Sequence, residues 1–280
     1  DNTVSNLDQG IYQSYSWGEP GAIAPNGTEV QHNSITGNGI GIGNQYSNQD
    51  SVIDAEENWW GAASGPGPVG PGSGDTVSTD VDYDPWLTGV APGTLQAIID
   101  LAAPGDVIQL GPYSYEGGIV IDKPVTLVGQ EGTVIGPGSS AYTIDASNVT
   151  IKNQTIDGLT GSDNDAAPGI LLKAGADNLT VEDCEIKRWG DGIKAEGDVT
   201  SLKVVGNWFH DNTDAGLQVD SDVTIDGNVK IWGNLFKANG GNGIQNNNSS
   251  TNLLAEYNSW GDIEGPKGSD GDDVSSNVNY

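Results

Sequence analysis

A short pattern recurs along the sequence and restricts the fold more than any other feature. Each copy is a β-branched run that ends at a polar or small residue, followed eight or nine residues later by Gly-Ile or Gly-Leu. The end positions include Asn2, Asn33, Cys184, Asn207 and Asn234, and from Cys184 to Asn258 they lie 23, 27 and 24 residues apart. A repeat of this length is one supersecondary unit that buries its apolar face only by stacking on its neighbours.

The period resembles that of the right-handed parallel β-helix, whose coils carry three short strands each. Strands of successive coils lie about 4.8 Å apart, so inward side chains form aliphatic stacks, while Gly, Asn and Asp suit the corners. We therefore expect an all-β fold, a right-handed parallel β-helix. The predicted stack contains Ile151, Val181, Val205 and Ile231. An antiparallel β-sandwich is the alternative, but nothing in a sandwich maintains a 23–27-residue phase.

A helical pattern interrupts the strands at residues 94–103. Leu95, Ile98, Ile99 and Ala102 form one apolar stripe, with Thr94 as the expected N-cap. Strand-like segments follow at residues 107–110, 119–121, 125–128 and 133–135. The helix resembles the cap that covers the N-terminal end of many β-helices. We therefore expect residues 1–88 to be the C-terminal part of one β-helix unit and residues 89–280 to be a second unit that begins with this capping helix.

Two closing motifs match almost residue for residue. The first is Asn58-Trp59-Trp60-Gly61 with Gly65-Pro66, ending at Tyr83; the second is Asn258-Ser259-Trp260-Gly261 with Gly265-Pro266, ending at Tyr280. The first continues as Asp84-Pro85-Trp86-Leu87. With these motifs the chain resembles the parallel β-helix repeat proteins (PbH1-type) exposed on archaeal and bacterial cell surfaces. The resemblance implies an extracellular, cell-surface location, but it implies little about activity, because one solenoid carries many functions.

Charge and composition exclude several classes of partner. The formal net charge is −29, and no basic cluster offsets it, so binding to nucleic acid is excluded and an anionic membrane surface is disfavoured. No apolar run approaches the roughly 18 residues that a membrane span needs. The single cysteine, Cys184, excludes an internal disulfide and is expected in the core.

An enzymatic alternative rests on one arginine. Some β-helix families, such as pectate lyases and uronan epimerases, use Arg or Lys to abstract a proton beside a carboxylate. Arg188, with Asp183 and Asp191 nearby in sequence, is the candidate catalytic group in this reading. A solvated, charged corner is the competing interpretation, and a groove for acidic polysaccharides should be basic, whereas this chain is strongly acidic.

Two kinds of modification or ligand remain open. Hard oxygen ligands on turns suit Ca²⁺, and the candidate ligands for a structural calcium ion are Asp211, Asp214, Asp220 and Asp222. Solvated loops are the alternative, and we expect no other cofactor. Asn-X-Ser/Thr glycosylation sites occur at Asn26, Asn148, Asn153, Asn178, Asn247 and Asn248.

The favoured function is a non-catalytic structural subunit of an extracellular cell-surface filament, sheath or appendage. Copies would assemble head to tail, since the end of a solenoid exposes strand edges and core that another coil can cover. The predicted contact residues are Asp1, Asn2, Ile11, Trp260, Val274 and Tyr280. Partners are therefore further copies of the chain. The tryptophans at closing motifs and strand ends are also a candidate surface for stacking on surface glycans, and packing at caps or junctions is the competing interpretation. The alternative is a secreted polysaccharide-binding or lyase/epimerase-like β-helix enzyme.

Overall fold

The computed structural model describes residues 2–14, 27–46, 52–158, 167–266 and 272–280. Contacts divide the chain into two compact units, Asp1–Leu101 with Gln109–Gly111, and Ala102–Ile108 with Pro112–Tyr280. The domain boundary between residues 88 and 89 stays a prediction. Asp1 and Asn26, a predicted assembly residue and a predicted glycosylation site, lie outside the described residues.

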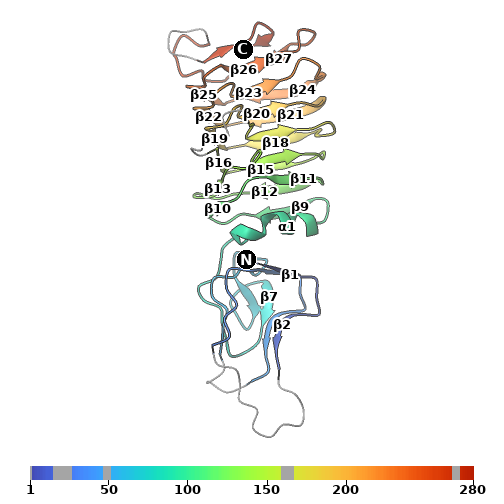
Figure 1. Cartoon of the computed structure of the whole chain (residues 1–280), viewed down its shortest axis with the longest axis vertical. Helices are drawn as coiled ribbons and strands as arrows, with labels where there is room; N and C mark the ends of the chain where they lie inside the picture. Colours follow the sequence, from blue (N-terminus) through green and yellow to red (C-terminus); the bar gives the residue numbers. More distant parts are fainter. Residues whose placement is uncertain (1, 15–26, 47–51, 159–166, 267–271) are drawn as a thin grey trace. The chain divides into compact units, whose positions relative to one another are not determined.

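Three long parallel sheets form most of the second unit, and successive coils add strands to each (Figure 1). Sheet A contains β9 (Asp106–Gln109), β12 (Val125–Val128), β15 (Thr150–Lys152), β18 (Leu179–Glu182), β21 (Val199–Val205) and β24 (Ile225–Trp232). Sheet B contains β10 (Ser114–Tyr115), β13 (Val134–Ile135), β16 (Thr155–Asp157), β19 (Glu185–Lys187), β22 (Trp208–His210) and β25 (Leu235–Lys237). Sheet C contains β11 (Ile119–Ile121), β14 (Tyr142–Ile144), β17 (Ile170–Leu172), β20 (Ile193–Ala195), β23 (Leu217–Val219), β26 (Asn242–Asn246) and β28 (Asp273–Val274). In the last coil β27 (Leu253–Leu254) pairs with β29 (Val278–Asn279), also in parallel, so the unit is a parallel β-helix.

The core of the second unit consists of columns of side chains that run from coil to coil. In sheet A the register aligns Ile151, Val181, Val204 and Ile231, all of them buried. The predicted stack was therefore right at three positions and wrong at Val205. Val205 lies in register with Glu182 and Trp232 and is half-buried, because neighbouring residues of a strand face opposite sides of the sheet.

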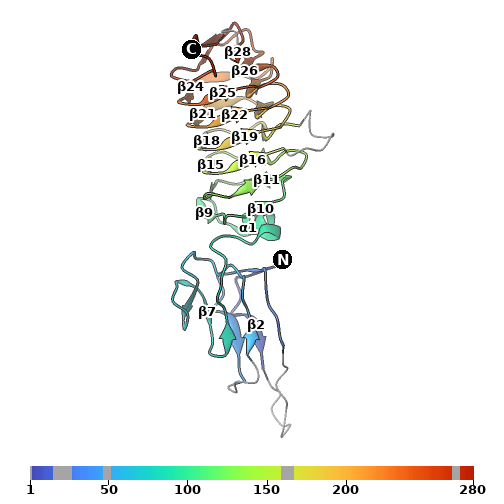
Figure 2. The same ribbon diagram turned by 90° about the vertical axis from the view of Figure 1, so that its left-hand side faces the viewer.

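Stacked aromatic rings fill the core behind sheet B near its C-terminal coils. Phe209 and Phe236 are in register, with ring centroids 4.9 Å apart at an interplanar angle of 8°. Trp260 stacks on Phe236 at 5.1 Å and 16°. Gly216 permits this packing, since a Cβ there would lie 2.7 Å from both the Phe236 ring and the Gly243 carbonyl. Figure 2 shows strands β21, β22, β24 and β25 of these coils from a second direction.

The first unit contains shorter parallel sheets. Its strands are β1 (Thr3–Ser5) with β3 (Ser34–Thr36); β2 (Gln9–Gln13), β4 (Ile40–Asn44), β7 (Gly74–Val77) and β6 (Pro66–Pro68); and β5 (Ile53–Asp54) with β8 (Val81–Asp82). Its core consists of Ile35, Ile42, Ile53, Ala55, Trp60, Val77 and Val81. The pairing of Ile53 with Val81 matches that of Leu253 with Val278 in the second unit.

The predicted helix is present but begins differently. A 3₁₀ turn, η1 (Pro92–Thr94), leads into α1 (Leu95–Leu101), and Leu95 and Ile99 are buried as the apolar stripe predicts. Thr94 is not the N-cap. Its hydroxyl contacts Ser34 Oγ at 2.6 Å and donates to the Ala91 carbonyl at 2.9 Å, so it closes the preceding turn and does not cap free amides.

The aromatic stack predicts a sharp contrast between two substitutions. Phe236→Ala is expected to lower the free energy of unfolding by about 3–5 kcal/mol, because it leaves a cavity between two stacked rings. The control is Trp232→Ala, which removes a ring that is 47% exposed and should cost about 1 kcal/mol or less. Chemical denaturation followed by circular dichroism measures both, and equal costs would contradict the assigned core.

Candidate functional site

A ladder of side-chain amides follows the corner between sheets A and B. This first ladder contains Cys184, Asn207, Asn234 and Asn258. Asn207 Oδ1 accepts the Cys184 backbone N–H at 2.9 Å, and Asn207 donates from its backbone N and its Nδ2 to Asn234 Oδ1 at 2.9 and 3.0 Å. Asn234 donates to Asn258 Oδ1 at the same two distances. Each side-chain amide therefore accepts the backbone N–H at the corner of the preceding coil.

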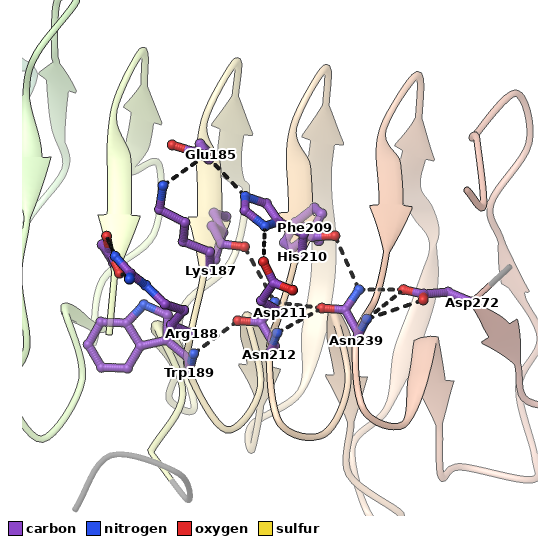
Figure 3. Close-up of polar contacts among 12 residues, drawn as sticks. Glu185, Lys187, Arg188, Trp189, Phe209, His210, Asp211, Asn212, Asn239 and Asp272 are labelled. Carbon is purple, nitrogen blue, oxygen red and sulfur yellow. Dashed lines mark hydrogen bonds and ion pairs between the residues drawn. The ribbon is translucent and has the colours of Figure 1, made fainter. Parts of the chain in front are cut away.

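A second ladder crosses the corner between sheets B and C (Figure 3). It contains Trp189, Asn212, Asn239 and Asp272. The Trp189 N–H donates to Asn212 Oδ1 at 3.1 Å, Asn212 Nδ2 donates to Asn239 Oδ1 at 2.8 Å, and Asn239 donates from its backbone N and its Nδ2 to the Asp272 carboxylate. Burial raises the pKa of Asp272, although the hydrogen bonds from Asn239 oppose the rise. Sequence analysis missed this ladder, whose signal is a second Asn five residues after the first, as in Asn207/Asn212 and Asn234/Asn239.

The first ladder generates a stability prediction. Asn207→Ala should lower the free energy of unfolding by about 1–3 kcal/mol, since it leaves the Cys184 N–H buried without a partner and removes the side-chain hydrogen bond to the Val181 carbonyl. The control Asn252→Ala removes an exposed Asn and should change stability by less than about 0.5 kcal/mol. A small effect of Asn207→Ala in urea denaturation would show that the ladder does not hold the corners.

The outer face of sheet B carries a cluster of charged side chains around Glu185 (Figure 3). Glu185 Oε1 lies 2.9 Å from Lys187 Nζ and 3.0 Å from His210 Nε2, and Glu185 Oε2 accepts the Thr155 hydroxyl at 3.1 Å. Burial alone would raise the pKa of Glu185, but the hydrogen bonds from Lys187 and His210 outweigh it and hold the pKa below its usual range. The carboxylate is thus an acceptor for three neighbours.

His210 is fixed on three sides. Its Nε2 faces Glu185, its Nδ1 lies 2.7 Å from Asp211 Oδ2, and its ring stacks on Trp208 at 3.9 Å and 23°. Neither ring nitrogen is left for a substrate or a metal ion. This arrangement orients the ring and links two coils.

The candidate catalytic residues lie in three separate sets of contacts. Arg188 Nε donates to Asp157 Oδ1 at 2.7 Å, and Arg188 Nη2 pairs with the second oxygen of this buried carboxylate. Hydrogen bonding to Asp157 raises the pKa of Arg188, which opposes a role as proton acceptor. Asp183 is a corner residue with φ of 53° that lines a 570 Å³ groove beside β16 and β19. Asp191 is buried and accepts the Ala215 N–H at 3.1 Å.

Asp191 predicts a pH effect on stability. Burial raises the pKa of Asp191 from 3.8 to about 6 against the opposing hydrogen bond from Ala215. A carboxyl whose pKa is raised by folding destabilises the fold as pH rises from about 4 to about 6, and the penalty is complete above that. Asp191→Asn keeps an acceptor for Ala215, so it should raise the free energy of unfolding by about 1–2 kcal/mol at pH 7.

The gain from Asp191→Asn should disappear near pH 3.5, where folded and unfolded chains both carry the protonated carboxyl. Thermal unfolding at pH 3.5 and pH 7 measures the difference. Asp222→Asn removes the same charge from an exposed turn and controls for relief of the overall negative charge. An equal gain in both variants at pH 7 would assign the effect to net charge and not to burial.

The four predicted calcium ligands have different surroundings, and two of them pair with a neighbouring histidine or lysine. Asp211 binds His210, Asp220 Oδ2 lies 3.5 Å from Lys194 Nζ, and Asp214 and Asp222 are exposed. Within the part of the chain that the structure describes, no group of three His, Cys, Asp or Glu side chains is arranged to hold a metal ion. The calcium site stays a prediction.

The other predicted positions differ in accessibility. The sequon asparagines Asn148, Asn153, Asn178 and Asn247 are exposed. Asn248 is buried, and its Nδ2 donates to the Val223 carbonyl at 2.6 Å, which leaves no room for a glycan in this conformation. Cys184 is buried as expected, and burial raises the pKa of its thiol to about 12.

Comparison with known families identifies the fold. A family model described as a right-handed beta helix region matches residues 114–259, just over half of the 280-residue chain. The chain therefore belongs to the right-handed β-helix family, which confirms the predicted fold. Comparisons with curated proteins and with solved structures each found no match. The family includes enzymes and non-enzymes, and among the described residues no helix is long and apolar enough to cross a membrane.

Proposed function

We propose that this protein is a non-catalytic structural component of an extracellular cell-surface filament, sheath or appendage, in which β-helix units are joined end to end. One observation carries the proposal. The same closing module occurs twice in the chain, at residues 53–83 and 253–280, and after the first module the chain goes on to form a second β-helix unit. We call a module that ends one unit and leads into another a joint.

The two closing modules agree in their ladder contacts. Asn33 N donates to Asn58 Oδ1 at 2.9 Å, as Asn234 N does to Asn258 Oδ1. Asn58 Nδ2 donates to the Ala55 carbonyl at 2.8 Å, and Asn258 Nδ2 donates to the Ala255 carbonyl at 2.7 Å. The turns that follow contain glycines with positive φ at 61 and 65 in one module and at 261 and 265 in the other.

The modules also agree at a carboxylate, half-buried at Asp75 and buried at Asp272. Asp75 accepts hydrogen bonds from the Asn38 backbone N and Nδ2 at 3.0 and 2.7 Å, and Asp272 accepts the equivalent pair from Asn239. The backbone N of each aspartate donates to a tryptophan carbonyl, Trp60 at 2.7 Å and Trp260 at 2.8 Å. Burial raises the pKa of both carboxyls. Such detailed repetition supports one shared role for the modules.

The edges of the described sheets supply surfaces for joining copies. At the N-terminal edge, a 540 Å³ groove is lined by residues that include Asn2, Val4 and Ile11. At the C-terminal edge, Tyr280 is 57% exposed and packs edge to face on the buried Trp260 at 6.3 Å, and Val274 of the last strand of sheet C is buried. We propose that copies associate head to tail through these two edges, with the solenoid sides remaining in solvent.

Head-to-tail association predicts a position-dependent effect of added charge. Tyr280→Asp should weaken self-association at least about tenfold, because it places a carboxylate in an apolar end contact. The control Val120→Asp adds the same charge on the side of the solenoid, where Val120 is 44% exposed on β11, and should leave association unchanged. Sedimentation velocity over a concentration series, with electron microscopy of the same samples, measures both variants.

Two outcomes would contradict the proposal. Association that is lost in Val120→Asp and kept in Tyr280→Asp would place the contact on the sides of the solenoid. Cleavage of polygalacturonate or alginate that disappears in Arg188→Ala would show a lyase-like enzyme.

A further inference from the structure

We propose that the second closing module carries a docking site for an extended peptide segment with the chemistry of Asp84–Leu87, entering beside Tyr280. We call residues 84–87 the closing segment, and we call the surface formed by Tyr257, Asn258, Ile263 and Gly265 the docking face. The inference rests on the proposed function, in which closing modules are joints. It adds the chemistry of the partner that completes the joint.

The first closing module shows how such a segment is held. The Glu57 N–H donates to the Pro85 carbonyl at 2.6 Å, and the Leu87 N–H donates to the Asn58 carbonyl at 2.9 Å. The Trp86 indole N–H donates to the Ala63 carbonyl at 3.1 Å. Three hydrogen bonds thus fix a four-residue segment in one register.

The indole ring of Trp86 fits against a glycine. A Cβ placed on Gly65 would lie 2.6 Å from the Trp86 ring, so the ring packs directly on the backbone there. Gly65 has φ of 84°, and Gly65 and Asn58 are both buried in this module. The surface formed by Gly65 and the Ala63 carbonyl therefore fits a flat aromatic side chain that also donates one hydrogen bond.

The two backbone bonds are those that inner coils make at the same corner. The Asn33 carbonyl accepts the Trp59 N–H and the Asn234 carbonyl accepts the Ser259 N–H, both at 2.8 Å. Likewise, the N–H of Gly233, the residue before Asn234, donates to the Tyr257 carbonyl at 3.1 Å. The closing segment thus supplies what a further coil would supply.

The docking face presents the same groups without an occupant among the described residues. There, the Tyr257 N–H, the Asn258 carbonyl and the Ile263 carbonyl have no hydrogen-bond partner, and nothing lies within 4 Å of a Cβ placed on Gly265. Gly265 has φ of 82°, close to that of Gly65. Tyr257 is 84% exposed and Ile263 is fully exposed, so the face is apolar as well as unpaired.

A variant with six added residues tests the docking site. The 280-residue chain is extended after Tyr280 with Asp-Pro-Trp-Leu-Thr-Gly, the sequence of residues 84–89, and the control variant is extended with Asp-Pro-Ala-Leu-Thr-Gly. Tethering raises the local concentration of the segment, so docking does not depend on high affinity. Hydrogen exchange of the Tyr257 amide should be at least about tenfold slower with the tryptophan extension than with the alanine extension. Fluorescence of the added tryptophan should shift to shorter wavelength.

The first module calibrates the measurement. Trp86→Ala should speed exchange at the Glu57 amide, whose partner is Pro85, and should leave the Tyr257 amide unchanged. Equal exchange of the Tyr257 amide in both extended chains would overturn the docking site. Exchange is measured at concentrations at which sedimentation shows a monomer, because a second copy stacked on the C-terminal edge would also protect the Tyr257 amide.

Failure of this inference and failure of the proposed function have different signatures. Loss of the docking site alone leaves concentration-dependent association that Tyr280→Asp weakens. Loss of end-to-end association alone leaves a monomeric chain in which the tryptophan extension still protects the Tyr257 amide.

Discussion

Hydrogen bonding between successive coils is the interaction on which the rest of this structure depends. Each strand of two to eight residues gains its partners only from the coils on either side, and each corner leaves backbone amides that a neighbour must satisfy. The ladder asparagines meet that need, because one side-chain amide accepts from the previous coil's corner and donates to a carbonyl. Core columns such as Phe209, Phe236 and Trp260 then follow from the register that these bonds impose. Stability is therefore shared between a dry core and two polar corner ladders.

Much of the fold could be predicted because its signals are local. The period between Cys184 and Asn258 predicted the coils, and the stripe of Leu95 and Ile99 predicted helix α1. Val205 was misplaced because adjacent valines in a strand look alike in sequence, while only register decides that Val204 faces the core. The site was harder to predict, since Arg188 finds its partner Asp157 31 residues away and one coil earlier. No local pattern reveals that the pair is formed.

The corner positions also explain why charged residues there resemble a catalytic cluster. Asp183 and Arg188 both have positive φ and occupy corners that Gly206 and Asp211 occupy in the next coil. Conformation selects residues such as Gly, Asn and Asp at these corners, and arginine is tolerated where a buried carboxylate holds its side chain. The groups that suggested proton abstraction are thus accounted for by the geometry of the solenoid. His210, held by Glu185, Asp211 and Trp208, belongs to the same network of contacts between coils.

The two ladders end at different kinds of residue: the second ladder at an aspartate and the first at an asparagine. A carboxylate accepts hydrogen bonds but donates none, so the second ladder stops at Asp272 as its counterpart stops at Asp75. The first ladder ends instead at an asparagine whose own carbonyl still accepts, and in the first module Leu87 fills that position. Ending a ladder at a carboxylate has a cost, because the partial or full burial of Asp75 and Asp272 raises the pKa of each carboxyl and makes its charged form destabilising. Every residue carries a backbone carbonyl, so the carbonyl alone does not mark a joint. What distinguishes the first module is that Leu87, in the segment leading to the second unit, uses it, and this continuation supports the proposal that both modules are joints.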